Sequence, residues 1–174
     1  MTNPNPFSGG AVGRVVAAPR ALAAWALLAY TALFLFFTFF SWLLGPGSFS
    51  GRAASAGFRN LFEMALPVLA VILATYIAPV LPGARLMAII ALAEYAVALF
   101  FGVITLLIGL GAVLDNVDTA WDSFNALQYL VMGLAALALI AIAAYVTLRA
   151  YLALGGRVPT FTPGPGTPPV PPAA

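Results

Sequence analysis

The sequence lacks two residue types on which much enzyme chemistry depends. Among its 174 residues there is no cysteine and no histidine. The absence of cysteine excludes disulfides, thiolate nucleophiles, iron–sulfur clusters and zinc–thiolate sites. The absence of histidine excludes an imidazole general base, a Ser-His-Asp triad and a histidine ligand to haem. We therefore expect a protein that is not an enzyme and that binds no cofactor and no metal ion.

Charge is also scarce. The chain carries seven arginines, no lysine and five acidic residues, so that 7% of its residues are charged whereas 63% are hydrophobic. Soluble domains have about 25% charged residues, and this chain has too little polar surface to cover a water-soluble globule. The few arginines form no clustered basic face for nucleic acid. The composition predicts an integral membrane protein surrounded by a lipid bilayer.

Four long apolar runs predict an all-α fold, a four-helix transmembrane bundle over residues 21–154. A helix needs about 20 apolar residues to cross a bilayer, and the runs cover residues 21–44, 61–81, 84–114 and 124–154. The first run is longer than the apolar region of a secretory signal peptide, so we expect it to be a membrane helix. In the second run, Pro67 predicts a bend and Pro79 helps to end the helix.

The segments outside these runs are expected to lack a packed structure. Residues 1–20 are polar and contain glycine and proline, which predicts a flexible cytoplasmic arm. Residues 155–174 hold seven of the 14 prolines and predict a disordered, Pro-rich cytoplasmic tail. The loop over residues 45–60 could form a short helix in its second half, along the membrane interface.

The distribution of arginine predicts the topology, because positively charged flanks tend to stay in the cytoplasm. Four crossings place both termini on one side, together with Arg14, Arg20, Arg85, Arg149 and Arg157. The other side holds Arg52 and Arg59. We therefore expect a multi-pass cell-membrane protein with both termini in the cytoplasm. Arginine as the only basic residue, with abundant alanine, suggests a GC-rich and bacterial genome.

Glu94 is the candidate functional residue, because it lies far from the ends of its apolar run. It follows Arg85 by about 13 Å along a helix, which places it close to the expected bilayer midplane. An ionisable side chain at that depth is costly and marks a candidate functional site. It shares a helix face with small residues, which let helices approach closely: Ala91, Ala98, Gly102, Thr105, Gly109 and Ala112. We expect Glu94 to point into the bundle.

Counting along the first two runs places four hydroxyl-bearing residues near the level of Glu94: Tyr30, Thr31, Thr75 and Tyr76. Desolvation disfavours a charged carboxylate there, and a neutral carboxyl group can exchange hydrogen bonds with hydroxyls. The first interpretation is a polar layer that fixes the packing of the helices. The alternatives are proton- or cation-linked transport, or contact with a cofactor, a lipid or a partner helix.

The remaining acidic residues are expected near the membrane surface. Glu63 follows Arg59 by four positions, a spacing that allows an interfacial ion pair. A second group of acids, at positions 115, 118 and 122, does not match the spacing of an EF-hand calcium loop and is expected to be a solvated loop.

The sequence as a whole favours a non-enzymatic accessory or scaffold subunit that acts through helix–helix contacts. Its expected partner is another membrane protein or a second copy of the chain. The alternative is an oligomeric proton- or cation-coupled small transporter or channel that uses Glu94.

Overall fold

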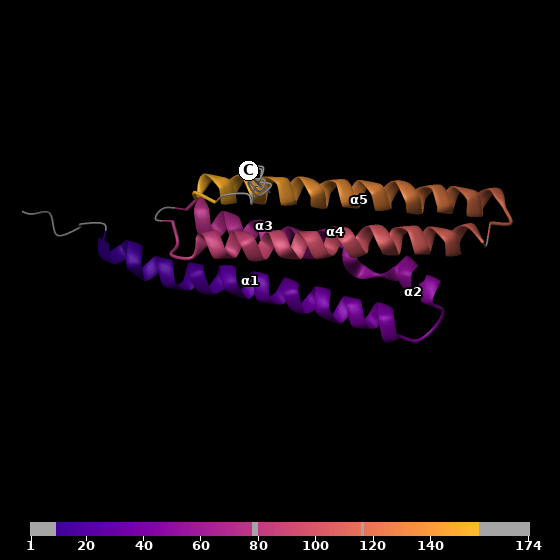
Figure 1. Cartoon of the computed structure of the whole chain (residues 1–174), viewed down its shortest axis with the longest axis horizontal. Coiled ribbons are helices and arrows are strands. Elements are labelled where there is room, and N and C mark those ends of the chain that lie inside the picture. Colours follow the sequence, from indigo (N-terminus) through magenta and orange to yellow (C-terminus); the bar gives the residue numbers. More distant parts are fainter. Residues whose placement is uncertain (1–9, 78–79, 116, 157–174) are drawn as a thin grey trace, which may run out of the picture.

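The chain folds into a bundle of long helices, with one short helix in the connection between the first and the second of them (Figure 1). The computed structural model describes residues 10–77, 80–115 and 117–156, with side chains from residue 18 onward. The all-α prediction is confirmed for these residues, since every regular element is helical. The elements are α1 (Gly10–Leu44), α2 (Phe49–Ser55), the 3-10 turn η1 (Gly57–Arg59), α3 (Leu61–Thr75), α4 (Ala84–Leu114) and α5 (Ala120–Ala153).

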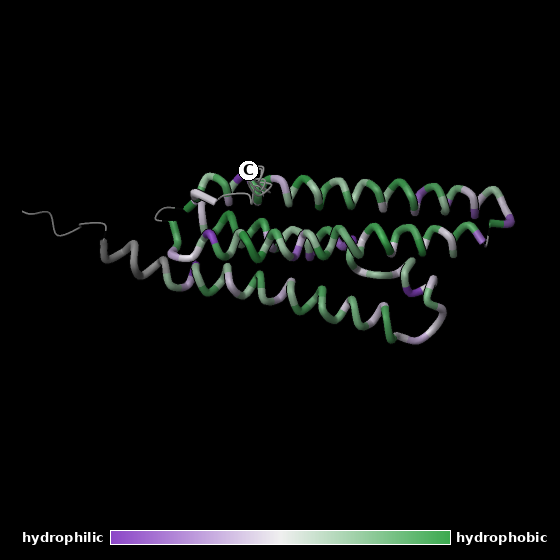
Figure 2. Tube along the Cα trace, viewed as in Figure 1, coloured by the Kyte–Doolittle hydropathy of each residue, from purple (hydrophilic) through white to green (hydrophobic). Residues whose placement is uncertain are grey.

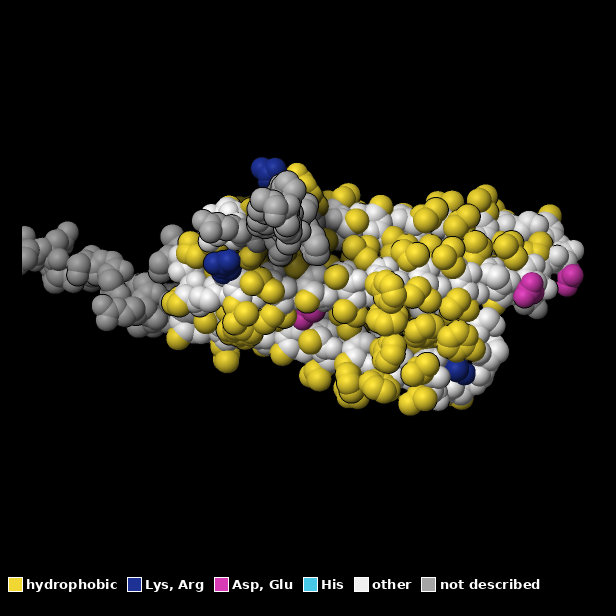
Figure 3. Space-filling view, viewed as in Figure 1, with side chains coloured by type: hydrophobic (Ala, Val, Ile, Leu, Met, Phe, Trp, Pro, Cys, Tyr) yellow, Lys and Arg dark blue, Asp and Glu magenta, His cyan; other side chains and the backbone are white. Residues whose placement is uncertain are grey.

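Four segments of the described chain are long and apolar enough to cross a membrane. They are Ala18–Leu44, Phe49–Thr75, Ala84–Leu114 and Ala120–Ala153. Hydrophobic residues follow the long helices over most of their length (Figure 2). In the space-filling view, hydrophobic side chains dominate the middle of the molecule, and most of the charged groups in view lie towards its two ends (Figure 3). One acidic group is visible among the apolar side chains between the ends.

Both predicted limits are correct for α4, whereas each of the other long helices differs from its prediction at one end or both. α1 begins at Gly10, inside the segment predicted to be a flexible arm. Residues 11–18 are alanine, valine, glycine and arginine, which do not compete for backbone hydrogen bonds as Ser, Asp or Asn do. Residues 1–9 of the predicted arm and 157–174 of the predicted tail lie outside the described residues.

α5 begins at Ala120, four residues before the predicted start, because Thr119 and Asp122 form a capping box. The Thr119 hydroxyl accepts a hydrogen bond from the Asp122 backbone N–H at 3.2 Å. The Asp122 carboxylate accepts one from the Thr119 backbone N–H at 2.9 Å. This exchange satisfies N–H groups that the start of a helix leaves unpaired. Asp122 is therefore part of a helix start rather than of a free loop.

α3 ends at Thr75, so the predicted end of the second helix at Leu81 is wrong. The chain turns back after Thr75, and the Leu81 backbone N–H donates to the Ala74 carbonyl at 3.0 Å. Pro79 and Pro82 each lack the backbone N–H of a helical hydrogen bond, and two such residues close together disfavour continuation of the helix. Gly83 then adopts φ 91°, in the left-handed region, and α4 starts at the next residue.

The connection predicted to be a loop at the interface instead runs back along α4 as α2 and η1. Gly109 of α4 makes this approach possible, since a Cβ atom there would lie 2.7 Å from the Ala54 Cα. Further along, a Cβ at Gly102 would lie 4.0 Å from the Phe58 carbonyl oxygen. These two glycines are about 10 Å apart along a helix. α3 therefore begins inside the bundle rather than at its end.

α4 is the central helix, because it contacts every other element of the described chain. The core has two parts. One joins α1, α3 and α4 through small and aliphatic side chains, among them Ala24, Ala70 and Met87. The other is rich in aromatic rings and surrounds the α2–η1 segment, where Phe58 stacks on Phe101 with ring centroids 5.4 Å apart.

Candidate functional site

Glu94 lies on the buried face of α4, as its spacing predicts. Its side chain is 5% exposed. The small residues predicted to share this face are buried, and Ala112 at its end is half-buried; the buried members are Ala91, Ala98, Gly102, Thr105 and Gly109. The predicted inward orientation of this face is therefore confirmed.

Glu94 is one of the residues that line a cavity of about 490 Å³ between α1 and α4. We call this cavity the α1–α4 groove. The other residues that line it are all apolar: Ala32, Leu35, Phe36, Phe39, Ile90, Ala93, Val97 and Phe101. Both oxygens of Glu94 are buried, and neither has a hydrogen-bond partner among the described residues. A buried polar group without a partner is costly, so this site needs an explanation.

The predicted hydroxyl partners of Glu94 are engaged elsewhere. The Thr31 hydroxyl donates to the Leu27 carbonyl of its own helix at 3.1 Å. The Thr75 hydroxyl donates in the same way to the Val71 carbonyl, at 2.8 Å. Tyr76 is the C-cap residue that follows α3, and its side chain is 74% exposed. The structure does not bring these hydroxyls together with Glu94.

The last predicted partner, Tyr30, bonds Glu63 instead: its hydroxyl donates to Glu63 Oε1 at 3.3 Å. Glu63 is buried, with 8% of its surface exposed. Tyr30 lies about 20 Å along α1 from the helix end at Leu44, so Glu63 is not at the end of the bundle. The α2–η1 segment occupies the outer part of this span, so Glu63 lies further along the bundle than counting from the start of the run implies; its interfacial position stays a prediction.

The predicted ion pair between Arg59 and Glu63 is not formed. Arg59 points towards α5, where its Nη2 donates to the Tyr129 hydroxyl at 2.9 Å. Its guanidinium carbon lies 4.9 Å from the centre of the Tyr129 ring, a cation–π distance. η1 and the start of α3 separate the two side chains, so one faces α5 and the other faces α1.

Tyr95 has a role that the sequence does not reveal. Its hydroxyl accepts a hydrogen bond from the Val68 backbone N–H at 3.0 Å and donates one to the Met64 carbonyl at 2.9 Å. An unbroken α-helix pairs these two backbone groups directly. The Tyr95 hydroxyl is thus inserted into α3 next to Pro67. Proline in the second run signals a disturbance there, but nothing in the sequence points to the residue that bridges it.

Two of the arginines used to predict topology bind the carbonyl ends of helices. Arg20 donates to the Leu73 and Ile77 carbonyls, at 3.1 and 2.7 Å, near the end of α3. Arg52 donates to the Trp42 and Leu43 carbonyls, at 2.7 and 3.3 Å, at the end of α1. A cation at a helix C-terminus satisfies unpaired carbonyls and is favoured by the helix dipole.

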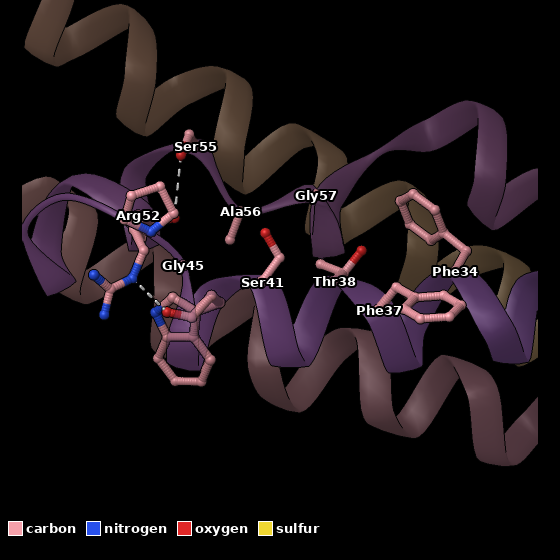
Figure 4. A pocket seen from close by; sticks show the side chains of 11 residues that line it. Phe34, Phe37, Thr38, Ser41, Gly45, Arg52, Ser55, Ala56 and Gly57 are labelled. Carbon is pink, nitrogen blue, oxygen red and sulfur yellow. Dashed lines mark hydrogen bonds between the residues drawn. The ribbon is translucent and has the colours of Figure 1, made fainter.

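Arg52 also borders a cavity of about 450 Å³ between α1 and the α2–η1 segment. Figure 4 shows the small polar side chains of Thr38, Ser41 and Ser55 around this space, with Arg52 turned towards the end of α1. The Ser55 hydroxyl donates to the backbone carbonyls of Gly51 and Arg52, at 3.2 and 3.3 Å. The Arg52 guanidinium at this cavity thus already donates hydrogen bonds to the backbone carbonyls of Trp42 and Leu43.

The chemistry available at these sites is hydrogen bonding and charge pairing. Over the described residues, no three acidic side chains lie close enough together to hold a metal ion. Comparison with known protein families, curated proteins and solved structures finds no match for this chain. The buried carboxyl of Glu94, beside an apolar groove and without a hydrogen-bond partner among the described residues, is the feature of the fold that most needs an explanation.

Proposed function

We propose that the chain is a non-enzymatic subunit that spans a membrane four times and binds a transmembrane helix of another protein in the α1–α4 groove. The observation that carries the proposal is the pair of buried Glu94 oxygens without a partner among the described residues. In an apolar medium such a group lowers its free energy by gaining a hydrogen bond. A partner helix with a hydroxyl, amide or cationic side chain at that depth would supply it.

The shape and lining of the groove support a helix as the occupant. Ala32 and Ala93 are small and exposed, which allows the backbone of a neighbouring helix to come close. Around them, Phe36 and Val97 are exposed apolar side chains, 54% and 40%, that would be covered by such a helix. An apolar surface around one central polar contact is typical of helix association within membranes.

The proposal is tested by a photo-reactive phenylalanine analogue at Phe36, with a matched control at Val131. Both positions are exposed, 54% and 53%, but Val131 is on α5 and outside the groove. We expect an adduct in native membranes from position 36 and none from position 131. The cross-linked peptide should map to a membrane helix that carries a polar side chain.

Glu94 variants make the test specific. Glu94→Leu should abolish the adduct, because it removes the polar anchor and leaves the shape nearly unchanged. Glu94→Gln distinguishes the partner chemistry: an adduct that survives indicates a hydroxyl or amide, whereas its loss indicates a cation. An adduct of equal yield in Glu94→Leu, or cross-links to lipid alone, would refute the proposal.

Transport coupled to protons or cations is the second candidate, supported by two buried acids on either side of α1. Glu63 contacts α1 at Tyr30, and the groove that holds Glu94 includes Ala32 and Leu35. Transport is the weaker candidate because the hydroxyls of Thr31 and Thr75 donate to carbonyls of their own helices. They therefore do not form a polar path that leads away from Glu94. The purified protein in liposomes decides between the two. A pH-dependent flux that Glu94→Gln abolishes favours transport, and no flux favours the contact role.

A further inference from the structure

A third cavity lies between the start of α3 and α5. Its volume is about 610 Å³. We call it the Arg59 pocket, because the Arg59 side chain borders it. Half of the residues that line it are polar and half are not. The polar residues are Arg59, Asn60, Asn125, Gln128 and Tyr129, and the others are Leu61, Phe62, Met132, Gly133 and Ala136.

The Arg59 guanidinium is poorly satisfied within the described chain. Nη2 bonds the Tyr129 hydroxyl, but Nε is buried without a hydrogen-bond partner. Nη1 packs against α5, since a Cβ atom at Gly133 would lie 2.6 Å from it. None of the described residues that line the pocket is acidic. A guanidinium in an apolar bundle is costly unless its N–H groups meet an anion or other hydrogen-bond acceptors.

Arg59 contrasts with the other arginine of the same connection. Arg52 donates from Nε, Nη1 and Nη2 to backbone carbonyls at the end of α1 and the turn after it. Such carbonyl contacts satisfy a guanidinium without any further ligand. At Arg59 one nitrogen bonds a phenol and another is orphaned, although an adjacent cavity is large enough for a ligand.

We propose that the Arg59 pocket binds a phosphate group. Arginine binds phosphate through several parallel N–H donors, and it does so best where water is excluded. Asn125 and Gln128 are exposed on α5, between its start and Arg59, and supply further donors on the way into the pocket. Phe62 and Met132, 71% and 63% exposed, provide an apolar surface beside it. This order of polar and apolar groups suits the headgroup phosphate and acyl chains of a phospholipid.

The test measures binding of defined phosphate compounds to the full chain in a phosphate-free maltoside detergent. Native mass spectrometry follows adducts of phosphatidylglycerol and phosphatidylcholine, and a thermal shift compares stabilisation by inorganic phosphate with stabilisation by the same two lipids. We expect both lipids to bind the wild type. Arg149→Gln is the control variant and should still bind both lipids, because Arg149 is exposed near the other end of α5. Arg59→Gln should weaken lipid binding roughly tenfold or more, through loss of charge-assisted hydrogen bonds.

The remaining outcomes identify the source of the phosphate or overturn the proposal. If inorganic phosphate stabilises the wild type as much as the lipids do, and Arg59→Gln removes that effect, the site takes free phosphate. Equal lipid binding in wild type and Arg59→Gln overturns the proposal. A second pair of variants covers the case in which Arg59→Gln fails to fold. Gln128→Trp fills the pocket from an exposed position, whereas Leu134→Trp adds the same ring on an exposed position of α5 outside the pocket.

We expect Gln128→Trp to lose lipid adducts and Leu134→Trp to keep them. Unchanged binding in Gln128→Trp contradicts a site in this pocket, whatever the behaviour of Arg59→Gln. The groove and the pocket share no residue. Loss of lipid binding at Arg59 should therefore leave the cross-link from position 36 intact, so that the two proposals can fail separately.

Discussion

The second apolar span and α4 pack against each other, but they are built in opposite ways. α4 is one helix of 31 residues, whereas the second span is divided into α2, η1 and α3 and carries Pro67 inside α3. Each division leaves backbone N–H or C=O groups without their helical partners. In an apolar environment those groups must find other partners, since no water is present to bind them.

Side chains of the regular helices α1 and α4 bond the backbone groups of the divided span that have no helical partner. From α4, Tyr95 bridges the Met64 carbonyl and the Val68 N–H. From α1, Arg20 binds two carbonyls near the end of α3. Gly109 of α4 leaves the space in which α2 packs. The irregular backbone is thus stabilised by its neighbours, and its stability should depend on particular side chains of those helices.

The largest effect is expected at Gly109, where α4 makes room for α2. In Gly109→Ala the new Cβ would lie 2.7 Å from the Ala54 Cα, a backbone atom that can move only with α2 as a whole. Overpacking of this kind should lower the free energy of unfolding by about 2 to 3 kcal/mol. The measurement is unfolding by SDS titration in mixed micelles, followed by tryptophan fluorescence.

Gly111→Ala is the matched control for this prediction. A Cβ at Gly111 meets nothing within 4 Å, so the same substitution on the same helix adds no clash. It should leave stability unchanged or raise it by up to about 1 kcal/mol, because alanine has the higher helix propensity. Equal destabilisation by the two variants would show that α2 does not depend on this close approach.

A smaller loss is expected when the bridge across Pro67 is removed. Tyr95→Phe leaves the Met64 carbonyl and the Val68 N–H without the hydroxyl that joins them, and should cost about 1 to 2 kcal/mol in the same titration. Tyr145→Phe is the control, since that hydroxyl is on an exposed side chain and has a 3.4 Å contact with Arg149. Its effect should stay within about 0.5 kcal/mol. Equal effects would mean that the two backbone groups pair again once the hydroxyl is gone.

The same contrast explains what could be predicted from the sequence. The limits of α4 were predictable because Pro82-Gly83 precedes it and Asp115 follows its long, largely apolar run. The buried face of Glu94 was predictable from spacing alone. Depth along the second span was not, because counting assumes that each helix starts at the membrane boundary. That assumption fails where residues 49–59 run back into the bundle, and it misplaced Glu63.

Contacts between distant side chains escaped prediction for a related reason. Tyr95 lies 31 residues from Met64, and their contact depends on how α3 and α4 are rotated against each other. The same rotation turns Arg59 towards Tyr129, 70 residues away, rather than towards Glu63. Spacing within one helix fixes a face, but it does not fix which neighbour that face meets.

The last prediction is a gain in stability rather than a loss, and it concerns Glu94, the residue next to Tyr95. Tyr95 is fully used inside the chain, whereas both Glu94 oxygens lack a partner among the described residues. Glu94→Leu replaces an unsatisfied buried acid with an apolar side chain of similar size. It should raise the free energy of unfolding of the isolated protein by about 1 kcal/mol.

Glu63→Leu is the matched comparison, because that acid accepts a hydrogen bond from Tyr30. It removes a bond and should lower stability or leave it unchanged. A stabilising Glu94→Leu that also loses the cross-link from position 36 would identify Glu94 as a group kept for binding at a cost to the fold. Destabilisation as large as that of Glu63→Leu would instead show that Glu94 supports the bundle itself. In that case the α1–α4 groove would need another explanation than an absent partner helix.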